Sequence, residues 1–329
     1  MNDNSTPDWW IFRGHGQPHD NIQQLPEPPP WRQFTAEGLD DRHRTFQPDP
    51  KEIELVNAAL YLRRPLLITG KPGVGKTSLA YAVAHELRLG EVLRWSITTQ
   101  TTLTDGLYRY DAIARLQQAS LLDKGSKPPP IENFLRLGPL GTAFAVADRP
   151  RLLLIDEIDK SDIDLPNDLL HIFEEGYFEI PELQRLPEGQ DMVTVRPHGA
   201  EPGTPGIPVV RGAVRCSPST FPLVMMTSNG EREFPPAFLR RCLRLEMRPP
   251  DEDKLLKIVN AHLHLAPGSD YESQAKKLIA DFFRRRQQTE LATDQLLHAV
   301  HLALKDIHPE QSFEDREALV EALWRSLSR

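Results

Sequence analysis

The chain has 329 residues, of which 39% are hydrophobic and 26% are charged, and its formal net charge is −8. This composition is typical of a globular protein, and the acidic balance argues against a protein built mainly to coat nucleic acid. The length exceeds that of one compact domain, so we expect one large and one smaller domain.

The cysteines and the N-terminal sequence predict the cellular compartment of the protein. Cys216 and Cys242 are far apart in the sequence and lack the spacing of metal-ligand cysteines. The first ten residues lack the basic and apolar regions of a signal peptide, and no apolar run approaches the roughly 20 residues that span a bilayer. We therefore expect a cytoplasmic protein in a reducing compartment, without a membrane partner.

Residues 1–49 are predicted to form an N-terminal arm. They contain three of the five tryptophans, Trp9, Trp10 and Trp31, among many prolines. Proline fixes φ and lacks an N–H donor, which favours an extended segment over a domain. Tryptophan is unusual in a solvated tail. Three alternatives stay open: the arm docks on the chain's own body, it docks on a neighbouring subunit or partner, or it is disordered.

Residues 50–248 alternate between predicted helices and short apolar strands. Helices are expected over residues 51–62 and 75–90. The expected strands cover residues 64–70, 92–97, 151–156, 222–229 and 243–247. Short apolar strands separated by helices predict an α/β domain with a parallel five-stranded sheet that is flanked by helices.

Three other stretches complete the expected domain organisation. Residues 122–138 contain DKGSKPPP and predict a surface loop. Residues 184–220 are rich in proline and glycine and predict an insertion with a long β-hairpin, formed by MVTVRP and GIPVVRGAVRC. Residues 249–329 predict a small all-α domain of four helices, the last from REALVEALWRSL. Its histidines His298 and His301 are expected to be packed or solvated rather than metal ligands.

A glycine-rich loop follows the first expected strand and opens a helix. GKPGVGKT matches the pattern G-x-x-x-x-G-K-[ST]. Its glycines let backbone N–H groups point at phosphate oxygens, and the helix N-terminus adds a partial positive charge. Lys76 is expected to reach the β- and γ-phosphates of ATP, and the Thr77 hydroxyl to bind Mg²⁺. The predicted nucleotide-binding residues are Gly70, Lys71, Pro72, Gly73, Val74, Gly75, Lys76, Thr77 and Ser78.

Polar residues also follow two later strands. LLLIDEIDK places Asp156 and Glu157 at the end of an apolar strand, where parallel sheets bind ligands. Asp156 is expected to hold Mg²⁺ through its water shell, and Glu157 to act as the general base for the attacking water. Asn229 ends the strand VMMTSN, where its amide could orient the water or contact the γ-phosphate.

This succession of motifs resembles the AAA+ ATPases and, within them, the MoxR branch. The resemblance rests on RPLLITGKPGVGKT, LLLIDEIDKSDIDLPNDLL, GYFEIPEL and the P-x-A-x-L-x-R pattern after Asn229, and it covers roughly residues 50–300. TLTDGLYRYDAIARL also resembles ATPases of this branch from bacterial ternary systems with von Willebrand factor A proteins. The resemblance implies a P-loop AAA+ domain over residues 50–248, followed by a helical lid domain over residues 249–329.

The resemblance also implies how the protein assembles. AAA+ proteins form rings with nucleotide between subunits, so we expect a homo-oligomer, most simply a hexamer, that acts on a protein client. Arg241 takes the position of the arginine finger, which stabilises charge on the γ-phosphate of the neighbouring subunit, and Arg240 is a second contact or a structural partner. The alternative is that both arginines pair with acids on their own surface. Thr293 and Asp294 stand where the family often carries a lid arginine, so that second sensor is expected to be absent.

Three functions remain open from the sequence. The first is a Mg²⁺-dependent ATPase that remodels or activates a protein partner. The second is a nucleotide-gated assembly switch that hydrolyses ATP slowly in a signalling or defence complex. The third is a DNA-directed motor or loader, against which the acidic balance argues.

Overall fold

The structure is a computed structural model that describes most of the chain. The described residues are 11–12, 14, 16–32, 45–123, 127–145, 148–187, 189–201, 203–263, 265, 268–289, 291–304 and 323–324. They fall into two compact units. The sheet unit comprises residues 48–71 and 75–248, and the helical unit comprises residues 1–47, 72–74 and 249–329.

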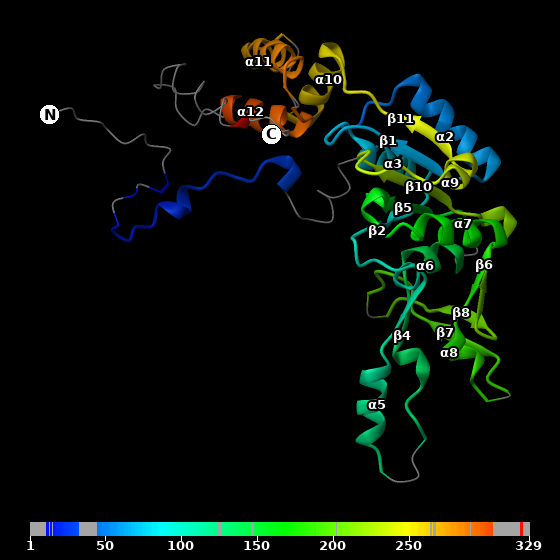
Figure 1. The fold of residues 1–329 in the computed structure, drawn as a ribbon. Helices are drawn as coiled ribbons and strands as arrows, with labels where there is room; N and C mark the ends of the chain where they lie inside the picture. Colours follow the sequence, from blue (N-terminus) through cyan, green and yellow to red (C-terminus); the bar gives the residue numbers. More distant parts are fainter. Residues whose placement is uncertain are drawn as a thin grey trace. The chain divides into compact units, whose positions relative to one another are not determined.

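A five-stranded parallel sheet forms the centre of the sheet unit (Figure 1). Its strand order is β11-β1-β10-β5-β2, and every neighbouring pair is parallel. The strands are β1 (Leu66–Thr69), β2 (Leu93–Ser96), β5 (Leu152–Asp156), β10 (Leu223–Ser228) and β11 (Leu243–Glu246). All residues of β5 and β10 are buried, which explains their continuous apolar sequences. The predicted sheet is confirmed.

Helices pack against this sheet, as predicted. They are α2 (Pro50–Leu62), α3 (Lys76–Glu86), α6 (Pro139–Ala145), α7 (Leu165–Glu175) and α9 (Pro236–Arg241). Helix α2 begins with a capping box in which Asp49 and Glu52 satisfy each other's backbone N–H groups. Helix α7 ends at Gly176 in the left-handed conformation. These local signals set the helix boundaries that position the strand ends.

The stretch between β2 and β5 is more ordered than the sequence indicates. It contains α4 (Leu103–Leu107), β3 (Tyr108–Tyr110), α5 (Ala112–Ser120), the 3₁₀ helix η4 (Ile131–Asn133) and β4 (Leu135–Leu137). Strands β3 and β4 form an antiparallel pair, with Leu135 and Leu137 buried. The prediction of a surface loop over 122–138 is therefore wrong for its second half, where residues 135–137 form a strand. This strand is short, follows a run of prolines and pairs with a strand 27 residues earlier, so its sequence alone did not indicate it.

The insertion after α7 is also larger than a hairpin. Strands β6 (Tyr177–Glu179), β7 (Met192–Val195), β8 (Ile207–Val210) and β9 (Ala213–Arg215) form an antiparallel sheet in the order β6-β9-β8-β7. The predicted pairing of the two sequence segments is found between β7 and β8. The prediction missed that GAVR turns back to pair with β6, where Phe178 and Val214 face each other. Helix α8 (Pro181–Gln184) and the 3₁₀ helix η6 (Pro218–Thr220) complete this region.

Three helices of the helical unit pack around one apolar core. They are α10 (Glu252–Leu263), α11 (Asp270–Arg286) and α12 (Thr293–Leu304). The core includes Leu255, Val259, Ile279, Phe282, Leu296 and Val300. Most of the predicted fourth helix lies outside the described residues; within it, Trp324 packs its edge against Phe282 at a centroid distance of 5.7 Å.

The described part of the arm contacts the helical unit through Trp31. Two short 3₁₀ helices, η1 (Asn21–Gln24) and η2 (Pro30–Arg32), lie in this segment. The Trp31 indole Nε1–H donates a 2.9 Å hydrogen bond to Nε2 of His298, and its ring lies edge-on to His301. At Trp31 the arm thus docks on its own chain, the first of the three alternatives. Trp9 and Trp10 lie outside the described residues.

Across the described part of the chain, no helix combines the length and the apolar character needed to cross a membrane.

Candidate nucleotide-binding site

The glycine-rich loop connects β1 to α3 at the carboxyl edge of the sheet. Gly75 has φ 99° and directly precedes Lys76, the first residue of α3. A side chain at this φ would be strained, so glycine is required for the chain to turn into the helix. The eleven-residue helix leaves its first N–H groups without helical partners, and these groups favour an anion.

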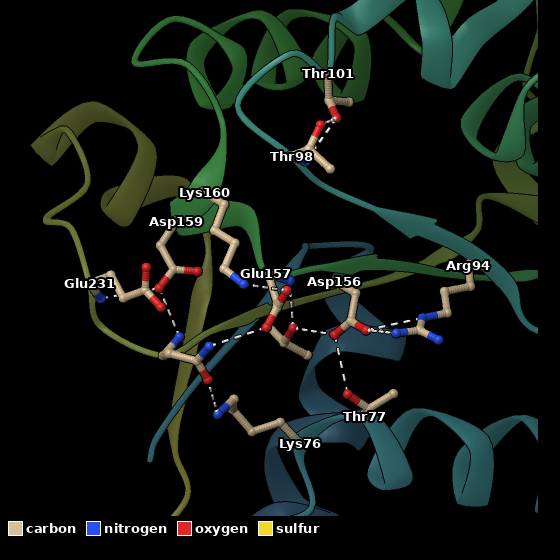
Figure 2. Close-up of polar contacts among 12 residues, drawn as sticks. Lys76, Thr77, Arg94, Thr98, Thr101, Asp156, Glu157, Asp159, Lys160 and Glu231 are labelled. Atoms are coloured by element: carbon tan, nitrogen blue, oxygen red, sulfur yellow. Dashed lines mark hydrogen bonds and ion pairs between the residues drawn. The ribbon is translucent and has the colours of Figure 1, made fainter. Parts of the chain in front are cut away.

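Lys76 points back into the loop and across to the end of β10 (Figure 2). Its Nζ donates to the backbone oxygens of Gly70 at 2.6 Å and Lys71 at 3.0 Å, and to Oδ1 of Asn229 at 2.8 Å. All three ammonium donors therefore have acceptors. Burial lowers the pKa of Lys76, and the nearby carboxylates of Asp159, Asp156 and Glu157 oppose that shift.

Asp156 ends β5 and is buried, with an exposed fraction of 5%. Its Oδ1 accepts hydrogen bonds from the hydroxyls of Thr77 at 3.2 Å and Thr227 at 2.6 Å. Its Oδ2 accepts two from the guanidinium of Arg94, at 3.0 Å from Nε and 2.6 Å from the terminal nitrogen. The structure thus joins the two predicted metal-site residues, Thr77 and Asp156, and adds two residues that the sequence did not indicate.

Glu157 follows Asp156 in a left-handed conformation, with φ 62° and ψ 49°. Its backbone N–H donates to the Thr227 hydroxyl at 2.9 Å. Its carboxylate lies between Nδ2 of Asn229 at 3.4 Å and Nζ of Lys160 at 2.8 Å. A non-glycine residue in this region costs about 1–3 kcal/mol and persists only where its surroundings hold it. The bond to Thr227 and the side-chain contacts hold Glu157 there.

Asn229 lies directly after β10 and bridges two predicted catalytic side chains. Its Oδ1 accepts from Lys76, and its Nδ2 donates to Glu157. The loop that carries it is fixed by the buried carboxylate of Asp159, whose Oδ2 accepts the backbone N–H groups of Asn229 at 2.9 Å and Glu231 at 3.1 Å. Sequence analysis assigned no role to Asp159, although a third acid so close to Asp156 was a usable signal.

The two arginines of α9 lie outside this network. Arg241 forms an ion pair through Nε with Glu174 of α7, and its side chain is 40% exposed. The backbone oxygens of Arg240 and Arg241 accept hydrogen bonds from the guanidinium of Arg64, which fixes the end of the helix. Within the described residues, no hydrogen bond or ion pair joins either arginine to Lys76 or Glu157.

The hydroxyl of Thr227 forms hydrogen bonds with both Asp156 and Glu157, so its removal should change stability and turnover measurably. Thr227→Val keeps the shape of a side chain that is 1% exposed but deletes the hydroxyl that binds both Asp156 and the Glu157 backbone. We expect a loss of about 1–3 kcal/mol in the free energy of unfolding, because the buried carboxylate of Asp156 and the part-buried N–H of Glu157 each lose a hydrogen-bond partner. ATP turnover should fall about 10- to 100-fold, as for other residues that orient metal ligands.

Urea unfolding and steady-state turnover measure these two effects. Thr220→Val is the matched control, because Thr220 is also buried but its hydroxyl has no hydrogen-bond partner among the described residues. Thr227→Ser, which retains the hydroxyl, should keep most of the turnover. Equal losses in Thr220→Val and Thr227→Val would show that the hydroxyl of Thr227 has no special role.

Comparison with known proteins agrees with this geometry. Residues 65–242 match the family model of the AAA domain, dynein-related subfamily, and this is more than half of the chain. The matched segment runs from the start of β1 to the end of α9 and contains every residue of the network around Asp156. No curated protein matches the chain. The chain therefore belongs to the AAA+ ATPases, in the dynein-related subfamily of AAA domains.

Proposed function

We propose that this chain is a Mg²⁺-dependent ATPase of the MoxR type, which assembles into a ring and uses hydrolysis to remodel or activate a protein partner. The observation that best supports hydrolysis is the bridge that Asn229 makes between Lys76 and Glu157. It places a cation, an amide and a carboxylate at one edge of the sheet, beside a helix N-terminus. These are the groups that phosphoryl transfer to water requires.

Each residue takes one part in the reaction. The backbone N–H groups of residues 70–77, other than Pro72, which has none, and the ammonium of Lys76 hold the β- and γ-phosphates. Lys76 thereby exchanges backbone oxygens for phosphate oxygens. Asn229 orients the attacking water. Glu157 accepts a proton from that water. At the same time the water oxygen bonds to the γ-phosphorus, and the bond between the γ-phosphorus and the β–γ bridging oxygen breaks. ADP and inorganic phosphate then leave.

The residues around Asp156 fit Mg²⁺. Asp156 offers carboxylate oxygens and Thr77 a hydroxyl 3.2 Å away, and Mg²⁺ is usually held by one or two such oxygens together with substrate phosphates. When bound, Mg²⁺ neutralises charge on the β- and γ-phosphate oxygens. Asp156 and Thr77 would hold it, and Thr227 would keep Asp156 oriented.

The proposed ring supplies each nucleotide with an arginine from the neighbouring subunit. In the proposed assembly Arg241 reaches the γ-phosphate bound by the next subunit, with Arg240 beside it, and the cytoplasmic client binds elsewhere on the ring. A protein with a von Willebrand factor A domain is our candidate client. The β6-β9-β8-β7 sheet is an elaboration of the sheet unit and is our candidate contact for it.

A slow assembly switch is a second candidate, and one observation favours it. One oxygen of the Glu157 carboxylate already accepts a hydrogen bond from Nζ of Lys160 at 2.8 Å, which leaves fewer acceptor positions for an attacking water. A turnover below about 0.01 per second, even with partner present, would favour the switch over an ordinary enzyme with 1–10³ per second.

The mass of the particle in solution tests the assembly, and ATP turnover tests the chemistry. We expect Glu157→Gln with ATP to form a hexamer of the 37.4 kDa chain, whereas the protein without nucleotide dissociates. Light scattering coupled to size exclusion measures this. A particle that keeps the mass of one chain at every concentration with ATP contradicts the ring. Failure to bind ATP at all contradicts the proposed chemistry.

A further inference from the structure

The carboxylate of Asp156 has no acceptor position left for another donor. A carboxylate offers about four lone-pair positions on two oxygens. Oδ1 accepts from the hydroxyls of Thr77 and Thr227, and Oδ2 accepts two N–H groups from Arg94. Figure 2 shows Arg94 reaching Asp156 from the side opposite Glu157. A metal with its water shell can therefore reach Asp156 only after one of these donors has left.

The three donors differ in how easily they can leave. Thr227 is 1% exposed on the central strand β10, and its hydroxyl also accepts the Glu157 N–H. Thr77 lies in the first turn of α3 and is itself an expected metal ligand. Arg94 lies on β2, at the edge of the sheet, and its long side chain is 44% exposed. Arg94 is therefore the most exposed of the three donors, and its side chain can move into solvent while the strand keeps its backbone bonds.

We propose that Arg94 is a positioning residue that neutralises Asp156 in the metal-free protein and must leave the carboxylate before Mg²⁺ can use it. This inference rests on the proposed function of Asp156 as the magnesium residue. It has two consequences. In the metal-free site, Arg94 keeps the buried charge of Asp156 from repelling phosphates. When metal arrives, the same ion pair opposes it, so Arg94 weakens the dependence of nucleotide binding on Mg²⁺.

The test is the ratio of the nucleotide dissociation constant in EDTA to that in saturating Mg²⁺. We would titrate a fluorescent, non-hydrolysable ATP analogue into the full chain in EDTA and in saturating Mg²⁺. In Arg94→Met the ratio should rise about three- to tenfold, because binding weakens in EDTA and no ion pair opposes the metal. Arg94→Lys keeps the charge but loses the two-donor contact, so its ratio should lie between the ratios of the parental protein and of Arg94→Met. The metal-free protein should also unfold at a lower temperature in Arg94→Met, since a buried carboxylate loses its counter-ion.

Arg284→Met is the matched control. Arg284 is an exposed arginine in a local ion pair with Asp281, so the variant loses the same charge and should keep the parental ratio. An unchanged or smaller ratio in Arg94→Met, with the control at the parental value, means that Arg94 does not compete with the metal, and the inference is wrong. If the unaltered protein does not bind the analogue in either condition, the proposed function fails first, and the inference fails with it.

Discussion

Glu157→Gln is expected to bind ATP but to hydrolyse it about 10²- to 10⁴-fold more slowly, because a positioned general base contributes about that factor. Glutamine has the size of glutamate and retains an oxygen that can accept the Asn229 amide, so the position of Asn229 should change little. The variant loses only a proton acceptor and the ion pair to Lys160. That pair is 44% exposed on the Glu157 side, and such pairs contribute about 0–1 kcal/mol.

Phosphate release and equilibrium nucleotide binding separate these two effects. Glu86→Gln is the matched control, since Glu86 is an exposed residue at the opposite end of the helix that begins with Lys76. The control should keep parental turnover and affinity. Glu157→Gln with more than about a tenth of the parental turnover would show that another group takes the proton. Loss of binding together with turnover would mean that Glu157 holds the phosphate loop rather than the water.

The sequence alone was sufficient to predict those parts of the site that are contiguous in the chain. The phosphate loop is a single run from Gly70 to Thr77, and its chemistry requires only the strand before it and the helix after it. Asp156, Glu157 and Asn229 were also predicted, because each follows a strongly apolar strand. In a parallel sheet all such strand ends meet at one edge, and the structure brings them together there.

The residues that hold these groups could not be read in the same way. Thr227 and Arg94 reach Asp156 only because β10 and β2 are the two neighbours of β5 in the sheet. The order of strands in a sheet cannot be predicted from the residues of a single sequence. Register matters as well: Arg94 lies beside Leu154, so it shares a face with Asp156 two residues further on. The β3–β4 pair was missed for a similar reason, since each strand has three residues and its partner is distant in the chain.

Arg241→Ala is expected to have the largest effect on turnover, a loss of about 10³- to 10⁵-fold with little change in ATP affinity. The structure holds the end of α9 in place through Arg64, which binds the backbone oxygens of both Arg240 and Arg241. Truncating the Arg241 side chain leaves those bonds intact, so the helix should keep its position. Arg240→Ala removes the neighbouring charge, tests the second contact and should cost less. Arg284→Ala is the matched control, because it removes an exposed arginine that pairs with Asp281 away from this site.

The own-chain contact of Arg241 gives a second control. If the ion pair with Glu174 were the only role of Arg241, Glu174→Gln would reproduce the loss, but a half-exposed pair contributes only about 0–1 kcal/mol, which is far below the expected effect. Mixing then tests action between subunits. Arg241→Ala chains retain Glu157, and Glu157→Gln chains retain Arg241, so only a mixed interface has both. Two inactive variants that recover turnover when mixed would place the arginine on the neighbour. Mixtures that stay inactive, although they form joint rings, would confine Arg241 to its own chain.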